Sequence, residues 1–250
     1  MLTESESRIE PAPAILQAAR RWLEPVRNVL GSEFISAYLT GSVLTRAFDP
    51  RRSRVNILIV AQRLDTALLV PIARAIPATR RAPHFDPLFL SRRQIEKSLD
   101  VFPIEWIEIQ ERHLLLAGED VVDRLQVART NLRLQLEHEL RSKQIQLRQT
   151  LLAAARKPAV LERTLAGAAS SFAALFRSLL RLRGEEPPAE AARVYERVAE
   201  VFQLDAAGLM VPHNVRHSGS GKRAEIPARY RSFLAELDRL IEAIDELRVP

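Results

Sequence analysis

The sequence predicts an α/β fold, a small mixed β-sheet with flanking helices, followed by a helical bundle. Short apolar runs bounded by turn residues are confined to the first half of the chain. Beyond residue 122, apolar residues recur three and four positions apart, as on helices with one buried face. Because the pattern changes there, we expect two domains, residues 1–122 and residues 123–250.

The first half is expected to open with a helix over residues 11–30, whose apolar side chains fall on one stripe. Two short apolar runs, FISAYL (34–39) and VNILIV (55–60), are rich in β-branched or aromatic residues, which favours strands. Asp65 is placed to cap a helix over residues 65–76. The remaining predicted elements are strands over FDPLFL (85–90) and FPIEWIEI (102–109), a short helix between them, and a strand within HLLLAGED (113–120).

The second half is predicted to be helical, with one exception. Its helices are expected over residues 123–156, from residue 158 to the region of Gly184, over 190–202 and over 232–247. The stretch PHNVRHSGSGKR (212–223) contains Gly, Ser and Pro without periodicity and is expected to form a loop. His213 and His217 belong to that stretch, so we expect loop residues there rather than a metal site.

Composition excludes several classes of function. The chain has no cysteine, which excludes disulfides, thiolate metal sites and cysteine nucleophiles and fits a cytoplasmic protein. No apolar run approaches the roughly 20 residues that cross a bilayer, so we expect no membrane segment. The net charge is +6, but the arginines alternate with acidic residues, so nucleic-acid binding is the least favoured interpretation.

Residues 38–60 (YLTGSVLTRAFDPRRSRVNILIV) carry the most informative motif. A predicted strand ends in Gly41-Ser42, and a second apolar strand begins about a dozen residues later. This arrangement resembles the nucleotidyltransferase domain of the DNA polymerase β superfamily, and FPIEWIEIQERHLLLAGED resembles a later part of such proteins. The resemblance implies that Gly41 and Ser42 open a helix whose amides hold nucleotide phosphates, with Arg46 and Arg54 close by.

The resemblance also implies a metal site that this chain has lost. In the family, Asp-x-Asp begins the second strand, and these carboxylates share a pair of magnesium ions with a third from a neighbouring strand. On this sequence the paired positions are Arg54 and Asn56, and the third is expected at Glu105. A guanidinium about 5 Å from a divalent ion costs on the order of 5 kcal/mol, so magnesium is not expected to bind. We instead expect Arg54 to form an ion pair with Glu105, and Glu108 to face the other side of the strand.

The sequence therefore favours a nucleotidyltransferase-fold protein that has lost two-metal catalysis and acts as a binding or regulatory module. Its expected ligand is a nucleotide or another phosphate-bearing molecule, and a protein partner is also open. The alternative is an active, magnesium-dependent enzyme that transfers a nucleotide to a small molecule or to a protein.

Overall fold

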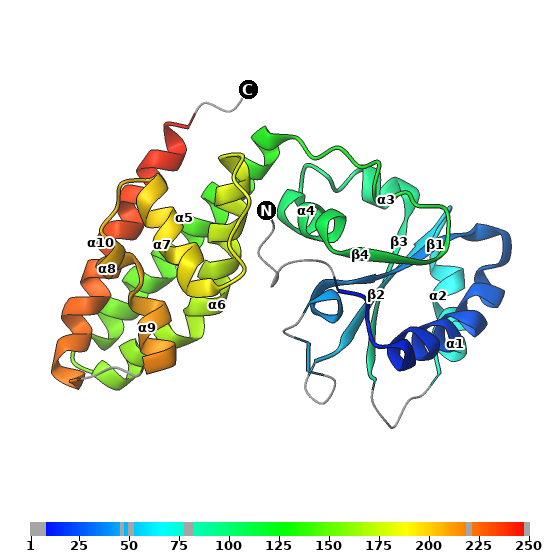
Figure 1. Ribbon diagram of the computed structural model, residues 1–250, viewed down its shortest axis with the longest axis horizontal. Helices are drawn as coiled ribbons and strands as arrows, with labels where there is room; N and C mark the ends of the chain where they lie inside the picture. The colour runs from blue at the N-terminus through cyan, green and yellow to red at the C-terminus, as the bar shows by residue number, and fades with distance from the viewer. Residues whose placement is uncertain (1–8, 46–47, 50–52, 78–82, 219–221, 248–250) are drawn as a thin grey trace. The chain divides into compact units, whose positions relative to one another are not determined.

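The computed structural model describes residues 9–45, 48–49, 53–77, 83–218 and 222–247 (Figure 1). Its chain divides into two compact units, Met1–Ala128 and Arg129–Pro250. The first contains a sheet with helices, and the described part of the second contains helices alone, so the predicted fold class is confirmed. The sequence analysis places the division after residue 122, whereas Val122 and Leu125 pack into a core of the first unit.

The first unit is built on one four-stranded mixed sheet with the strand order β3-β2-β1-β4. Its strands are β1 (Phe34–Thr40), β2 (Val55–Ala61), β3 (Phe85–Ser91) and β4 (His113–Gly118). β1 is antiparallel to β2 and to β4, and β2 is parallel to β3. β1 therefore ends at the edge of the sheet where β2 and β3 begin, and Thr40, Asn56 and Asp86 are neighbours there.

Helices cover both faces of this sheet (Figure 1). Ile57 and Ile59 of β2 belong to a core on one face, and Leu58 and Val60 belong to a core on the other. Successive strand residues point to opposite faces, so burial on both faces explains the nearly continuous apolar run of VNILIV. The first face is covered by α1 (Pro13–Leu30) and α2 (Thr66–Ala75), and the second by α3 (Arg92–Glu96) and α4 (Pro103–Glu111).

The segment FPIEWIEI forms helix α4 rather than the predicted strand. Pro103 lies in the first turn, where its fixed φ and missing N–H suit a helix start. The buried Pro103 and Trp106 and the partly buried Ile109 recur every third residue, which places them on one face of a helix. The Trp106 indole also donates to Ser98 Oγ at 2.9 Å. The strand prediction was wrong because the apolar–acidic alternation of this segment obscured the three-residue spacing.

The second unit is a bundle in which α6 packs against α5, α7, α9 and α10. Its elements are α5 (Arg129–Ala154), α6 (Pro158–Leu182), α7 (Ala191–Val201), α8 (Ala206–Leu209), α9 (Val211–Ser218), η3 (Arg223–Glu225) and α10 (Ile226–Asp245). Phe172 of α6 meets Phe233 of α10 edge-on, with ring centroids 5.0 Å apart. Among the described helices, α6 is the one long and apolar enough to cross a membrane, and 56% of its most apolar window is buried within the protein.

The first part of the predicted loop 212–223 is helical, because residues 212–218 belong to α9 (Val211–Ser218). Val211 and Val215 are buried, and α9 packs against α6. The rings of His213 and His217, one helical turn apart, stack with centroids 4.3 Å apart. The loop prediction was wrong because the glycines of this stretch all follow His217 and say nothing about the residues before it.

A group of hydrogen-bonded side chains ties β1 and β4 to the segment that follows the sheet. The Tyr38 hydroxyl lies 3.3 Å from Asp120 Oδ1 and accepts the Val121 N–H at 2.8 Å. His113 Nε2 lies 3.3 Å from Asp120 Oδ2. Burial alone would raise the pKa of Asp120, but hydrogen bonds from the Asp123 amide and from His113 outweigh it and hold the pKa below its usual value.

We predict that Asp120→Asn lowers the free energy of unfolding at pH 7 by about 1 kcal/mol, less than for a buried charged group because the Asp120 side chain is 36% exposed. The pKa of Asp120 is lower in the folded protein than in the unfolded chain. The Asp120 carboxylate therefore stabilises the folded protein above the pKa that it has in the unfolded chain. This stabilisation is lost as the pH falls through the pKa that it has in the folded protein. Urea denaturation should show that the free energies of unfolding of the wild type and the variant differ at pH 7, and that this difference becomes smaller below about pH 4. A pH-independent difference would contradict this assignment.

Candidate functional site

Arg54 and Asn56 lie at the start of β2, where the side chains of the strand are accessible. Arg54 directly precedes the strand and Asn56 is its second residue. Being two positions apart on an extended chain, both point to the same face of the sheet, whereas Val55 between them is buried in the opposite core. Both side chains are exposed. This edge of the sheet therefore presents a guanidinium and an amide.

The carboxylate beside these two residues belongs to Asp86, the second residue of β3. Asp86 is paired with Asn56 in the parallel ladder between β2 and β3. Arg54 Nη2 lies 3.7 Å from Asp86 Oδ1 and donates to the Phe85 carbonyl oxygen at 3.4 Å. The two side chains of the ion pair are 62% and 59% exposed, so solvent screens their attraction. The expectation that Arg54 pairs with Glu105 was wrong, since the partner is Asp86.

Glu105 reaches the same edge of the sheet from a helix instead of a strand. It lies in the first turn of α4. Glu108 follows three residues later, and residues three apart lie on one side of a helix. Both side chains line one cavity with Asp86. The expectation that Glu108 faces away from Glu105 was therefore wrong, because it assumed the spacing of a strand.

These residues surround a cavity of about 460 Å³ at the edge where β1 ends and β2 and β3 begin. Among the described residues that line it, Asp86, Glu105 and Glu108 bring carboxylates and Asn56 brings an amide. Its apolar walls come from the exposed Leu88 and the partly buried Pro87 and Ile109, and it is also lined by Ile57 and Leu58, whose side chains are buried. Asp86 pairs with Arg54, and Glu105 and Glu108 have interactions of their own, so the cavity presents polar and apolar groups side by side.

Gly41 and Ser42 form a short turn instead of the predicted start of a helix. Residues Gly41–Leu44 make a single 3₁₀ turn, η2. Gly41 has a φ of +74°, and a Cβ at this position would lie 3.2 Å from Asn56 Nδ2. Glycine suits this position because it adopts a positive φ without strain and leaves room for the Asn56 amide.

The four residues expected to hold phosphate are not equally placed to do so. The Gly41 N–H already donates to the Arg112 carbonyl oxygen at 3.3 Å. Ser42 is exposed, and Arg54 is engaged with Asp86. Arg46 lies outside the described residues. Phosphate binding by Ser42 and Arg54 stays a prediction.

Asp86 is the residue of this site that sequence reasoning missed. A signal for it is present in the sequence, because Asn56 and Asp86 are each the polar second residue of a short apolar run, VNILIV and FDPLFL. Such residues meet when the two strands are parallel neighbours that begin at the same edge. The third carboxylate was predicted within FPIEWIEI instead, because the pattern of that segment is typical of a strand next to β2.

We predict only a weak energetic coupling between Arg54 and Asp86. A double-mutant cycle with Arg54→Gln and Asp86→Asn, measured by urea denaturation, should give a coupling free energy of at most about 0.5 kcal/mol. The matched cycle with Arg54→Gln and Glu105→Gln should give no measurable coupling. A coupling of about 1 kcal/mol or more in the second cycle would show that Arg54 pairs with Glu105 after all.

No protein-family model matches the sequence, and no curated protein matches it. Among solved structures, the chain is similar to a spectinomycin adenyltransferase from Enterococcus that was crystallised with ATP and spectinomycin. The TM-score is 0.44 at 12% identity, over 92% of this chain and 98% of that chain. It is also similar to a nucleotidyltransferase-like protein from Exiguobacterium sibiricum, with a TM-score of 0.43 at 13% identity, over 92% of this chain and 75% of that chain. Both likenesses are distant, so the candidate site rests on the residues of this chain.

Proposed function

We propose that this protein has a nucleotidyltransferase fold, does not carry out two-metal catalysis, and acts as a binding or regulatory module. The observation that carries the proposal is the ion pair of Arg54 with Asp86 at the edge of the sheet. In the arrangement implied by the resemblance, two acids at the start of one strand and a third on its neighbour share the metal ions. Here the corresponding residues are Arg54, Asn56 and Asp86, whose formal charges sum to zero.

Charge is the reason that this set does not fit magnesium. Mg²⁺ prefers anionic oxygen ligands in an octahedral shell. Asn56 offers a neutral oxygen, and Arg54 both repels a divalent cation and pairs with the Asp86 carboxylate beside it. Among the described residues, no three His, Cys, Asp or Glu side chains are placed to hold a metal ion together. No catalytic step through a metal is therefore derived for this site.

The cavity supports the binding part of the proposal. Its volume of about 460 Å³ lies within the range of small-molecule pockets, roughly 300–1,000 Å³. Its apolar walls suit a flat or aliphatic group, and the carboxylates of Glu105 and Glu108 suit hydrogen-bond donors on it. A nucleotide would place its base or sugar against these walls and its phosphates toward Ser42 and Arg54, outside the acidic part.

One observation favours the alternative of an active enzyme. Asp86, Glu105 and Glu108 line the same cavity, so acidic groups are present even though they do not stand at the positions implied by the resemblance. An active enzyme would transfer a nucleotide to a small molecule or to a protein acceptor and would depend on Asp86.

We predict that the protein transfers no labelled nucleotide from ATP to itself, to other proteins or to small hydroxylated acceptors, with or without Mg²⁺. The measurement is incorporation of label from α-labelled ATP, with Asp86→Asn as the matched control. The proposal fails if the wild type forms a Mg²⁺-dependent product that Asp86→Asn does not form.

Replacing the two non-acidic positions should create a metal site. In Arg54→Asp/Asn56→Asp, three carboxylates meet at this edge, so Mg²⁺ or Mn²⁺ should raise the melting temperature. A hundredfold excess of metal over its Kd corresponds to about 2.7 kcal/mol of stabilisation. Metal should not raise the melting temperature of the wild type. Adding Asp86→Asn to the double variant should abolish the rise that metal causes in that variant. A wild-type shift as large as that of the double variant would contradict the proposal.

A further inference from the structure

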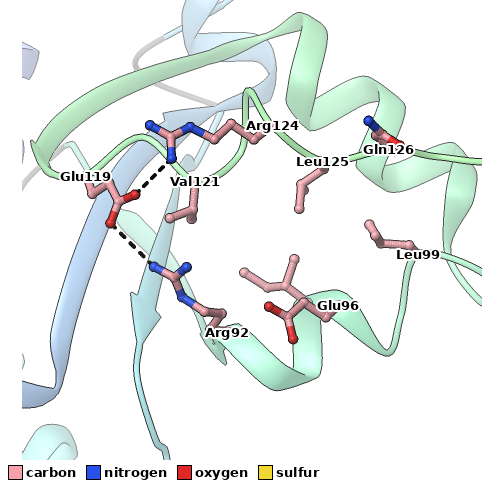
Figure 2. Close-up of a pocket in the computed structure, with 9 residues that line it drawn as sticks. Arg92, Glu96, Leu99, Glu119, Val121, Arg124, Leu125 and Gln126 are labelled. Carbon is pink, nitrogen blue, oxygen red and sulfur yellow. Dashed lines mark hydrogen bonds and ion pairs between the residues drawn. The ribbon is translucent and has the colours of Figure 1, made fainter.

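A second cavity lies elsewhere in the first unit, between α3 and the segment that follows β4. Its volume is about 280 Å³. Ile95 and Leu99 line it from α3 and the turn after it, and Val121 and Leu125 line it from the segment after β4 (Figure 2). These side chains belong to, or pack against, the core of that face of the sheet. The cavity therefore has an apolar floor that a hydrocarbon group would cover.

One end of this cavity is cationic. The Glu119 carboxylate lies between two guanidinium groups, 3.4 Å from Arg92 Nη2 and 3.3 Å from Arg124 Nη1 (Figure 2). A guanidinium has five N–H donors, so each arginine keeps donors beyond the one that faces Glu119. Arg92 Nε is buried and has no hydrogen-bond partner within the described part of the chain. Buried donors are nearly always paired in folded proteins, so the described acceptors do not saturate the Arg92 guanidinium.

The other charged wall of the cavity is anionic. Glu96 lines the cavity one helical turn after Arg92. Its side chain is exposed and forms no hydrogen bond or ion pair with a described residue. The cavity thus combines a cationic group that retains a free donor, an unpaired carboxylate and an apolar floor.

We propose that this cavity binds a small zwitterion with an apolar side group, of the kind represented by a free aliphatic amino acid. The ligand carboxylate accepts hydrogen bonds from the two terminal nitrogens of Arg92, whose side chain is partly exposed, in a bidentate arrangement that guanidinium groups favour. The ligand ammonium group faces Glu96, and the hydrocarbon group covers Ile95, Leu99 and Leu125.

The volume of the cavity is consistent with a ligand of that size. At about 30 Å³ for each water molecule, 280 Å³ corresponds to roughly nine waters, and leucine has about nine non-hydrogen atoms. This second site shares none of its lining residues with the cavity that holds Asp86 and Glu105, so it does not depend on the function proposed above.

Calorimetric titration of the full chain with three probes tests the proposal. The probes are L-leucine, 4-methylpentanoate, which lacks the ammonium group, and 3-methylbutylamine, which lacks the carboxylate. Leucine should bind, and each of the other two should bind at least about tenfold more weakly, because each leaves one charged group of the cavity without a partner. Equal affinity for leucine and 4-methylpentanoate, or no heat with any probe at millimolar concentration, would overturn the proposal.

Substitutions at the two charged walls separate their roles. Glu96→Gln should lower the affinity for leucine at least about tenfold and leave the affinity for 4-methylpentanoate unchanged, since only leucine has an ammonium group. Arg92→Lys should lower the affinity for leucine and for 4-methylpentanoate, because lysine cannot offer the bidentate pair of donors. Arg93→Gln is the matched control, since Arg93 neighbours Arg92 but does not line the cavity, and it should change neither affinity. Leucine binding that survives both Glu96→Gln and Arg92→Lys would place the ligand elsewhere.

Discussion

The burial of β2 on both faces is the constraint on which the first unit depends. This strand pairs with β1 on one side and with β3 on the other, and helices cover both of its faces. From Val55 to Ala61, Asn56 is the one exposed residue. A side chain of β2 can therefore meet a ligand only at the edge where the strand begins. The register between β2 and β3 then brings Asp86 to the same place.

The charges at that edge decide what chemistry it supports. Arg54 and Asp86 form an exposed ion pair, and Asn56 beside them contributes a neutral amide. α4 adds Glu105 and Glu108 above the same edge. The edge therefore carries charged, neutral polar and apolar groups together. The first unit has one cavity at this edge and another beside α3.

The sequence predicted the strands that are buried on both faces and the helices with a clear apolar stripe, because burial imposes a simple spacing on those residues. It failed for α4 and α9. In FPIEWIEI, a helix of only about two turns has too few residues for its spacing to be distinguished from a strand. In PHNVRHSGSGKR, the glycines lie after His217, but they led to the prediction of a loop for the whole stretch, including the residues that form α9. Because of the first error, the third carboxylate was expected at Glu105 and Asp86 was overlooked. The hydrogen bond of the Gly41 amide to Arg112 was not predictable either, since it depends on how β4 is reached from α4.

We propose that the edge of the sheet around Arg54 and Asp86 does not use a divalent metal. The sharpest test is the affinity of the wild type for a non-hydrolysable ATP analogue, measured with and without Mg²⁺. We expect a Kd that Mg²⁺ does not lower, or no binding under either condition. An affinity that Mg²⁺ raises by about tenfold or more, and that Asp86→Asn abolishes, would show instead that Asp86 holds a metal.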